Sequence, residues 1–246
     1  MRYDDYIFDL YGTLVDIHTD EEATELWAEM AAYYGRQGAD YQPDELHTAY
    51  RRLTAAAEAE LSSAPLRQDA HEAHPEIKIE LVFQQLFREK GVDADLEQAV
   101  RAGRRFRERS TEYIRLYNGA KELLGSLRES GGRVWLLSNA QSIFTSWELD
   151  CLGLTDYFDG IYLSSDYGVK KPDRRFFDIL LRERGISPDC AVMIGNDGQC
   201  DIQGGQIAGL STLYIHSNLS PNEPAPGADF VLERMDLGRV KEILLA

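Results

Sequence analysis

The chain has 246 residues, 43% of them hydrophobic, so it is long enough to bury a substantial core. Its formal net charge of −16 at pH 7 argues against nucleic acids and anionic membranes as primary partners. Residues 1–5 lack the apolar run of a signal peptide, and no apolar stretch reaches the length of a bilayer-spanning helix, so we expect a cytoplasmic protein. The three cysteines are widely spaced and indicate neither a disulfide framework nor a zinc site.

The first predicted element is a short strand formed by the apolar run Tyr6-Ile7-Phe8, and it ends in Asp9. A turn that contains Gly12 follows at once. Open α/β folds bind their ligands at the carboxyl ends of their strands. Asp9 is therefore a candidate nucleophile.

Residues 17 to 115 have helical character, and we find no convincing strand among them. Apolar residues recur there at spacings of three and four, as in Leu26, Met30 and Tyr33. The periodicity and the Pro and Gly boundaries predict four helices, at about 20–35, 43–61, 75–91 and 95–113.

From about residue 118 the predicted elements alternate between helix and strand. The buried strands are expected at 133–137, 160–163, 191–194, 212–215 and 230–232, and the helices at 120–130, 141–152, 173–184, 201–209 and the carboxyl end. Such alternation predicts an α/β fold with a doubly wound parallel sheet.

The first strand stands far from the rest of this pattern, so the helical block is predicted to be an insertion. We expect a core made of residues 1–16 and 115–246, and an all-helical cap domain made of residues 17–114. A cap placed directly after the turn that follows Asp9 would close over it and exclude water.

Polar side chains follow four of the predicted strand ends. They are Asp9, the pair Ser138-Asn139, the pair Lys170-Lys171, and Asn196-Asp197 with Asp201. In a parallel sheet these ends share one edge, so the residues are expected to converge. Singly, each has an ordinary role as a turn former or helix cap. Together they supply a nucleophilic carboxylate, an anion-binding hydroxyl, a cation and an acid pair, which are the parts needed for phosphoryl transfer.

The segments that carry these residues resemble, in order, the four motifs of the haloacid dehalogenase-like (HAD) hydrolase superfamily. They are Phe8–Asp16, Leu137–Asn139, Gly168–Asp173 and Ile194–Asp201. The resemblance covers nearly the whole chain, including a helical cap after the first motif, and it implies a Rossmann-like core. It is specific for the superfamily and far less specific for the substrate.

The resemblance assigns a role to each motif. It implies that Asp9 is the nucleophile, that Ser138 with Asn139 binds the transferred group, and that Lys171 is the motif lysine. Lys170 is the weaker candidate, because the family lysine usually stands directly before a proline, here Pro172.

In phosphatase members of the superfamily the acidic residues hold Mg²⁺. The resemblance implies that Asp9, the backbone carbonyl of Tyr11, Asp197 and Asp201 would do so here, with Asp201 acting directly or through a water. Counting back from Asp201 in many relatives places the first acid at Asn196, whereas a loop shorter by one residue places it at Asp197. We favour Asp197, since an amide is a weaker ligand for a hard cation.

Tyr11 departs from the phosphatase pattern, in which aspartate at this position serves as general acid and base. A phenol with a pKa near 10 matches proton transfer at neutral pH poorly, and loss of a positioned acid costs about two to four powers of ten in rate. A phosphatase with Tyr11 should be slow or should favour leaving groups that need no proton.

Haloacid dehalogenases commonly carry Asp-x-Tyr-Gly-Thr, as this chain does at Asp9 to Thr13. Halide leaves without protonation, so Asp9 would attack carbon and form an ester that water hydrolyses, with no metal. However, those enzymes generally have a Ser/Asn-bearing fourth motif and a tyrosine where this chain has Phe177.

The sequence therefore favours a Mg²⁺-dependent phosphatase that acts on a small phosphorylated metabolite through an aspartyl-phosphate on Asp9. One alternative is a metal-independent 2-haloacid dehalogenase, and another is a catalytically weak member that binds a ligand. We expect a small anionic substrate as partner, and a monomer or a homodimer.

Five arginines crowd the last predicted cap helix: Arg101, Arg104, Arg105, Arg107 and Arg109. One interpretation is a solvated helix face whose arginines pair with Glu97, Glu108 and Glu112. The other is that one arginine points into the cleft and binds an anionic group of the substrate.

Overall fold

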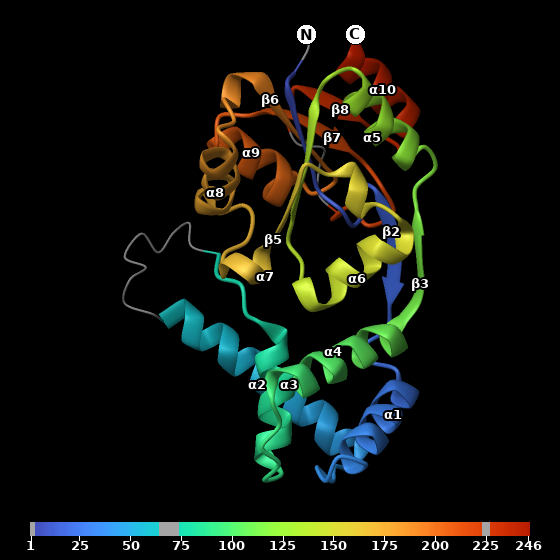
Figure 1. Cartoon of the computed structure of the whole chain (residues 1–246), viewed down its shortest axis with the longest axis vertical. Coiled ribbons are helices and arrows are strands. Elements are labelled where there is room, and N and C mark those ends of the chain that lie inside the picture. The colour runs from blue at the N-terminus through green and yellow to red at the C-terminus, as the bar shows by residue number, and fades with distance from the viewer. Residues whose placement is uncertain (1–2, 64–73, 223–226) are drawn as a thin grey trace.

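The computed structural model describes residues 3–63, 74–222 and 227–246. Figure 1 shows a sheet covered by helices, with both ends of the chain nearby, and a separate group of helices at the opposite end of the molecule. Two extended strands join the two parts. Within the described residues no helix is long and apolar enough to cross a membrane.

The sheet of the larger part has six parallel strands, which confirms the predicted α/β class. In spatial order they are β5 (Gly160–Leu163), β4 (Arg133–Ser138), β1 (Asp5–Phe8), β6 (Ala191–Gly195), β7 (Ser211–Ile215) and β8 (Phe230–Leu232). Phe8 at the end of β1 pairs with Leu136 of β4 and Ile194 of β6. Because β1 is central and parallel to both neighbours, the residues that follow these three strands share one edge.

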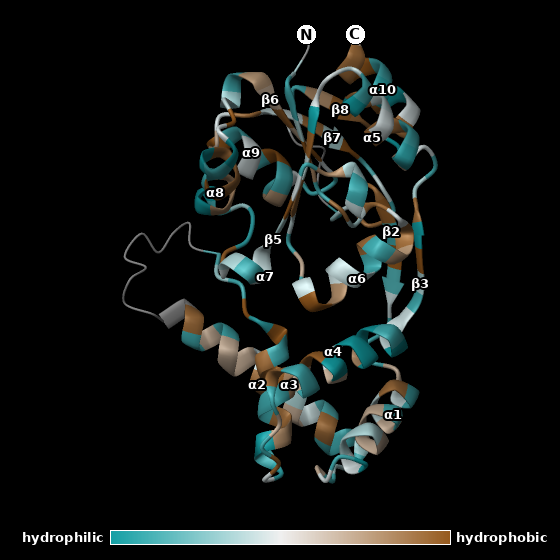
Figure 2. Cartoon of the chain, in the orientation of Figure 1, coloured by the Kyte–Doolittle hydropathy of each residue, from teal (hydrophilic) through white to brown (hydrophobic). Residues whose placement is uncertain are grey.

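Alternate residues of β1 enter two separate hydrophobic layers, as a sheet covered on both faces requires. Tyr6 and Phe8 belong to the cluster that packs beneath α5 (Ala120–Glu129) and α10 (Leu237–Leu245). Ile7 belongs to the cluster beneath α8 (Arg174–Arg184). The remaining helices of this part are α6 (Ser142–Leu152), α7 (Ser164–Tyr167) and α9 (Gly204–Ile207). Figure 2 shows hydrophobic residues along the strands and hydrophilic residues over much of α8.

Four helices form the second part, which we call the cap. They are α1 (Thr24–Gly35), α2 (Pro43–Ser63), α3 (Ile79–Glu89) and α4 (Leu96–Ser110). Their buried side chains make a hydrophobic cluster of their own, which also takes in Ile143 and Phe144 of α6. The cap therefore rests on α6 of the sheet part.

The prediction that residues 17 to 115 contain no strand is wrong. Two strands, β2 (Val15–Thr19) and β3 (Thr111–Leu116), pair antiparallel, and Ile17 lies opposite Ile114. Much of this ribbon is exposed and polar, so it lacks the apolar run that marks a buried strand. The predicted limits of the cap, at residues 17 and 114, fall inside the ribbon and stay a prediction.

Three predicted helices begin elsewhere. The helix expected at about 20 starts at Thr24. The helix expected at 75 starts at Ile79, because the preceding residues run extended and Pro75 makes an antiparallel bridge to Val169. The helix expected at 201–209 is a π-helical turn, Gly198–Gln203, followed by α9. Asp197 caps that turn, which explains its early start.

Candidate active site

Lys171 lies at the centre of the edge where β1, β4 and β6 end. Its side chain is buried, and its Nζ donates to Asp9 Oδ1 at 2.8 Å, to Asp201 Oδ1 at 2.7 Å and to the carbonyl of Leu137 at 2.7 Å. An ammonium group has three protons, and all three are used here. The predicted nucleophile, the motif lysine and the last motif acid therefore form one cluster, which we call the Lys171 cluster (Asp9, Lys171 and Asp201).

The Lys171 cluster holds two carboxylates for one ammonium group. Burial disfavours the charge on Lys171, but Asp201 and Asp9 outweigh that effect and raise the pKa of Lys171. Burial also raises the pKa of Asp201 to about 7. The charge of Lys171 lowers this pKa, and the charge of Asp9 raises it. The cluster is thus short of positive charge at neutral pH.

The two residues of the second motif have different tasks. Ser138 is buried, and its Oγ donates to Asp9 Oδ1 at 3.2 Å. The amide of Asn139 is occupied by the backbone of Lys171, accepting from its N–H at 2.8 Å and donating to its carbonyl at 2.9 Å. Asn139 therefore fixes the loop that carries the lysine. The binding of a phosphoryl group by Ser138 and Asn139 stays a prediction.

Thr13 is a site residue that the sequence analysis did not single out. It is fully buried, and its Oγ1 lies 3.4 Å from Asp9 Oδ2 and 3.2 Å from Asn196 Oδ1. The only signal for it was its place inside the first motif, four residues after the nucleophile. Both oxygens of Asp9 thus face side chains of the site, but Oδ2 has only this one long contact among the described residues.

Asn196 and Asp197 point in different directions. The Asn196 side chain is buried against the turn after β1, where a Cβ on Gly12 would lie 2.2 Å from its Nδ2. Gly12 has φ +85°, so it gives both the space and the left-handed turn. Asp197 instead accepts from the backbone N–H groups of Gln199 and Cys200. Asn196 is the more deeply buried of the pair, but both residues line a cavity beside Asp9, so the choice of Asp197 as a metal ligand, which the sequence analysis favoured, stays a prediction.

Tyr11 turns its hydroxyl away from Asp9 and into the junction with the cap. The hydroxyl donates to Glu148 and is 2.9 Å from Thr145 Oγ1. Burial, and next the charge of Glu148, raise the pKa of Tyr11 far above its usual value. The phenol is therefore neutral, and its proton is engaged by a carboxylate of α6.

The five arginines of α4 have separate partners. Arg101 pairs with Glu97, as one interpretation of the sequence expected, whereas Arg105 and Arg109 pair with Glu29, Arg104 donates to the carbonyl of Ile143, and Arg107 pairs with Glu148. A cavity opens beside Asp9, and among the described residues none of these five arginines lines it.

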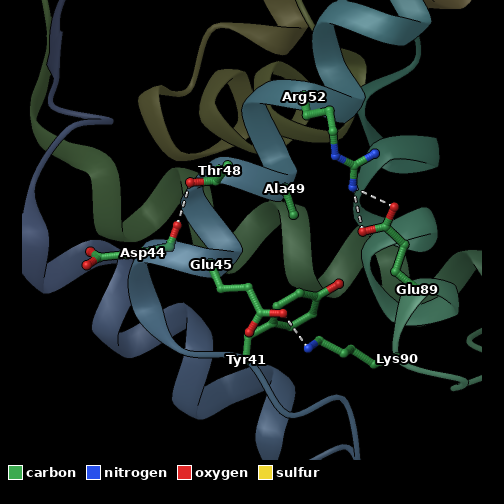
Figure 3. Close-up of a pocket in the computed structure, with 8 residues that line it drawn as sticks. All are labelled: Tyr41, Asp44, Glu45, Thr48, Ala49, Arg52, Glu89 and Lys90. Carbon is green, nitrogen blue, oxygen red and sulfur yellow. Dashed lines mark hydrogen bonds and ion pairs between the residues drawn. The ribbon is translucent and has the colours of Figure 1, made fainter.

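A cavity of about 170 Å³ opens beside Asp9. Its lining includes Tyr11, Ser138, Asn139, Lys171, Asn196, Asp197, Cys200 and Asp201, with Leu219 and Pro221 from the loop after β7. Three carboxylates and one lysine therefore face it. A larger hollow of about 470 Å³ lies on the cap, but its cations are already paired, Lys90 with Glu45 and Arg52 with Glu89, as Figure 3 shows.

The lining of the small cavity suits a hard cation. Within the part of the chain that the structure describes, no three His, Cys, Asp or Glu side chains gather as a metal cage. Mg²⁺ does not need such a cage, since it usually takes one or two carboxylates and keeps several waters. Asp9 and Asp201 supply two carboxylates, and Asn196 adds an amide oxygen. The donor set and its negative charge therefore fit Mg²⁺.

Comparisons with known proteins agree with this geometry. A family model for hydrolases, described as haloacid dehalogenase-like hydrolase, matches residues 4–209. The phosphoserine phosphatase of Thermus thermophilus is 30% identical over 166 residues, which are 65% of this chain and 65% of that enzyme. The chain thus matches slightly under two thirds of this relative's length.

Two solved structures have the same fold. The 2-haloacid dehalogenase of Pseudomonas syringae aligns over 100% of this chain and 99% of its own, with a TM-score of 0.65 and 20% identity. The HAD-hydrolase YfnB of Bacillus subtilis, solved with magnesium bound, aligns over 100% of both chains with a TM-score of 0.57 and 21% identity. At such identities these structures support the fold alone.

Proposed function

The chain belongs to the haloacid dehalogenase-like hydrolase family, and on that premise we propose that it is a Mg²⁺-dependent phosphatase of small phosphorylated metabolites. The observation that carries the proposal is the Lys171 cluster, in which a strand-end carboxylate is held beside a second carboxylate by one buried lysine. Asp9, the carbonyl of Tyr11, Asp201 and one of Asn196 and Asp197 would hold the metal ion.

Asp9 is prepared to attack through one particular oxygen. Its Oδ1 accepts from Lys171 and Ser138, whereas the 3.4 Å hydrogen bond from Thr13 is the only one to Oδ2 from a described residue. In the first step a bond forms between Oδ2 and phosphorus, the bond to the leaving oxygen breaks, and that oxygen keeps the electron pair. In the second step water attacks phosphorus, the bond to Asp9 breaks, and inorganic phosphate and the free carboxylate result.

Charge is the main argument for a cation in this reaction. Asp9, Asp197 and Asp201 face the cavity, and Lys171 is the single basic residue of its lining within the part of the chain that the structure describes. A phosphate dianion would be repelled by this surplus of negative charge. Bound Mg²⁺ would supply the missing positive charge beside the phosphoryl oxygens.

A metal-independent 2-haloacid dehalogenase is the second candidate. The presence of a tyrosine at position 11 favours it, because halide leaves without a proton and needs no general acid there. Its carboxylate substrate would also need a cation, yet among the described residues no arginine lines the cavity. Phe177, which stands where the resemblance places a dehalogenase tyrosine, is buried beneath the sheet instead. Both observations weigh toward the phosphatase.

Parallel release assays test the proposal. We expect the purified protein to release phosphate from p-nitrophenyl phosphate with Mg²⁺, to stop in EDTA and to recover when Mg²⁺ is restored. Halide release from 2-chloropropionate, independent of metal and without phosphate release, would replace the phosphatase with the dehalogenase. If neither product forms, while phosphate compounds raise the melting temperature, the chain is a ligand-binding member.

A further inference from the structure

A buried polar bridge links the cap to the turn that follows the nucleophile. Arg107 of α4 donates from Nε to Glu148 Oε1 at 2.6 Å, and Glu148 of α6 accepts from the hydroxyl of Tyr11. Thr145 of α6 contacts the same hydroxyl at 2.9 Å. We call these residues, Arg107, Glu148, Thr145 and Tyr11, the Arg107 bridge. Its last member stands two residues after Asp9.

The bridge is almost completely removed from water. The Glu148 side chain is 2% exposed and the Arg107 side chain 13% exposed. The guanidinium of Arg107 also lies over the rings of Tyr11 and Phe144, with its carbon 5.6 Å and 5.5 Å from the two ring centres. Because a buried charge is costly without its partner, separating cap and core here would expose or unpair both charges.

Close packing of α4 on α6 holds the bridge in place. A Cβ on Gly103 would lie 2.6 Å from Ile143 Cδ1 and 3.0 Å from the Phe83 ring, so any larger residue here would force these side chains to shift. Beside it, Arg104 Nε donates to the carbonyl of Ile143 at 3.3 Å. A shift of α4 would therefore be transmitted to α6 and, through Glu148, to the Tyr11 turn.

Resting on the function proposed above, we propose that Arg107 and Glu148 are positioning residues that tie the docked cap to the nucleophile turn and keep the Tyr11 hydroxyl away from the leaving group. Turnover then requires the docked cap. Because no carboxylic acid stands at the position of Tyr11, the substrates are aryl or acyl phosphates, whose leaving groups depart unprotonated, rather than alkyl phosphates.

Steady-state kinetics of single and double variants test the bridge. Glu148→Gln keeps the size of the side chain and removes its charge, and Arg107→Met removes the cation. With an aryl phosphate we expect each to lower kcat roughly tenfold with little change in KM, and Arg107→Lys to recover part of the loss. Arg101→Met is the matched control, since Arg101 lies on the same helix in an exposed pair with Glu97.

Coupling along the bridge gives a sharper criterion. Tyr11→Phe removes the hydroxyl and Glu148→Gln removes the charge of the same contact, so their effects should not add, and the double variant should be little slower than the slower single variant. If the variants only lower the melting temperature, and kcat and KM stay at wild-type values, the bridge is structural and the proposal is wrong. Equal turnover of matched alkyl and aryl phosphates by the wild type would also contradict it.

Hydrogen exchange tests the proposal about the Arg107 bridge separately from the proposal that the protein is a phosphatase. If the wild type releases no phosphate, the amides of residues 10–15 should still exchange faster in Glu148→Gln and Arg107→Met than in the wild type and in Arg101→Met. Unchanged exchange in that turn would overturn the bridge, whatever the enzyme activity proves to be.

Discussion

Two buried charge clusters flank the nucleophile turn, and they differ in balance. The Lys171 cluster places two carboxylates on one cation inside the sheet part, beside an open cavity. The Arg107 bridge places one carboxylate on one cation between cap and core, closed to water. A cluster short of positive charge is prepared to receive a cation or to react. A balanced cluster is suited to holding two parts of a protein together.

The largest expected effect follows from removing the nucleophile. Asp9→Asn deletes the attacking oxygen, so turnover of an aryl phosphate should fall by at least about three powers of ten. Stability should not fall with it, because Lys171 keeps Asp201 as a partner and one of two repelling carboxylates is gone. Kinetics and thermal unfolding measured together check this. A variant with full activity would remove Asp9 as nucleophile.

Removing the cation from each cluster compares them directly. Lys171→Met leaves Asp9 and Asp201 buried and unpaired and should destabilise the fold by about 3–5 kcal/mol near neutral pH. Arg107→Met leaves only Glu148, which still accepts from Tyr11, so its cost should be smaller. Urea unfolding of both variants measures the difference. A larger loss for Arg107→Met would mean that the bridge, and not the Lys171 cluster, dominates stability.

Titration should reveal the second carboxylate of the Lys171 cluster. The pKa of Asp201 is raised from 3.8 to about 7, so between these values the folded protein binds a proton that the unfolded chain has lost. Its contribution to stability therefore falls as pH rises from about 4 to about 7. Melting temperatures in EDTA at about pH 5 and about pH 8 should show a smaller decline for Asp201→Asn than for the wild type. Equal declines would show that Asp201 does not titrate in this range.

The smallest expected effects concern the neighbours Asn196 and Asp197. Asp197→Ala removes the cap of the π-helical turn and should cost about 0.5–2 kcal/mol of stability. Asn196→Asp adds a charge to the more deeply buried position of the pair and should lower the Mg²⁺ concentration needed for half-maximal phosphate release. If Asp197→Ala weakens the Mg²⁺ response without loss of stability, Asp197 is a ligand, as the sequence analysis favoured.

Much of the Lys171 cluster could be predicted because its signals are local. Strands β1 and β6 are apolar runs followed by polar residues, and parallel topology brings their ends together, while Lys171 and Asp201 lie a few residues farther on inside recognisable motifs. Thr13 lies inside the first motif, but its contact with the nucleophile was not predicted. The ribbon of β2 and β3 was missed because its residues are largely exposed, so tertiary placement rather than an apolar pattern makes these strands.

The Arg107 bridge had no such signal. Glu148 is 137 residues from Tyr11 in sequence and belongs to no motif, and Arg107 is one of five arginines on a single helix. Only the close approach of α4 to α6 selects Arg107 from that group.

By itself the sequence determined the α/β class, the order of most elements, and the residues that meet at the sheet edge, because strand periodicity and motif spacing are properties of short segments. The tertiary structure decided the direction of individual side chains. It buried the Asn196 side chain in the space at Gly12 and engaged the Asp197 carboxylate as the cap of the π-helical turn. It also turned the hydroxyl of Tyr11 toward Glu148. The two residues are far apart in sequence, so only the packing of α6 beside the nucleophile turn brings them together.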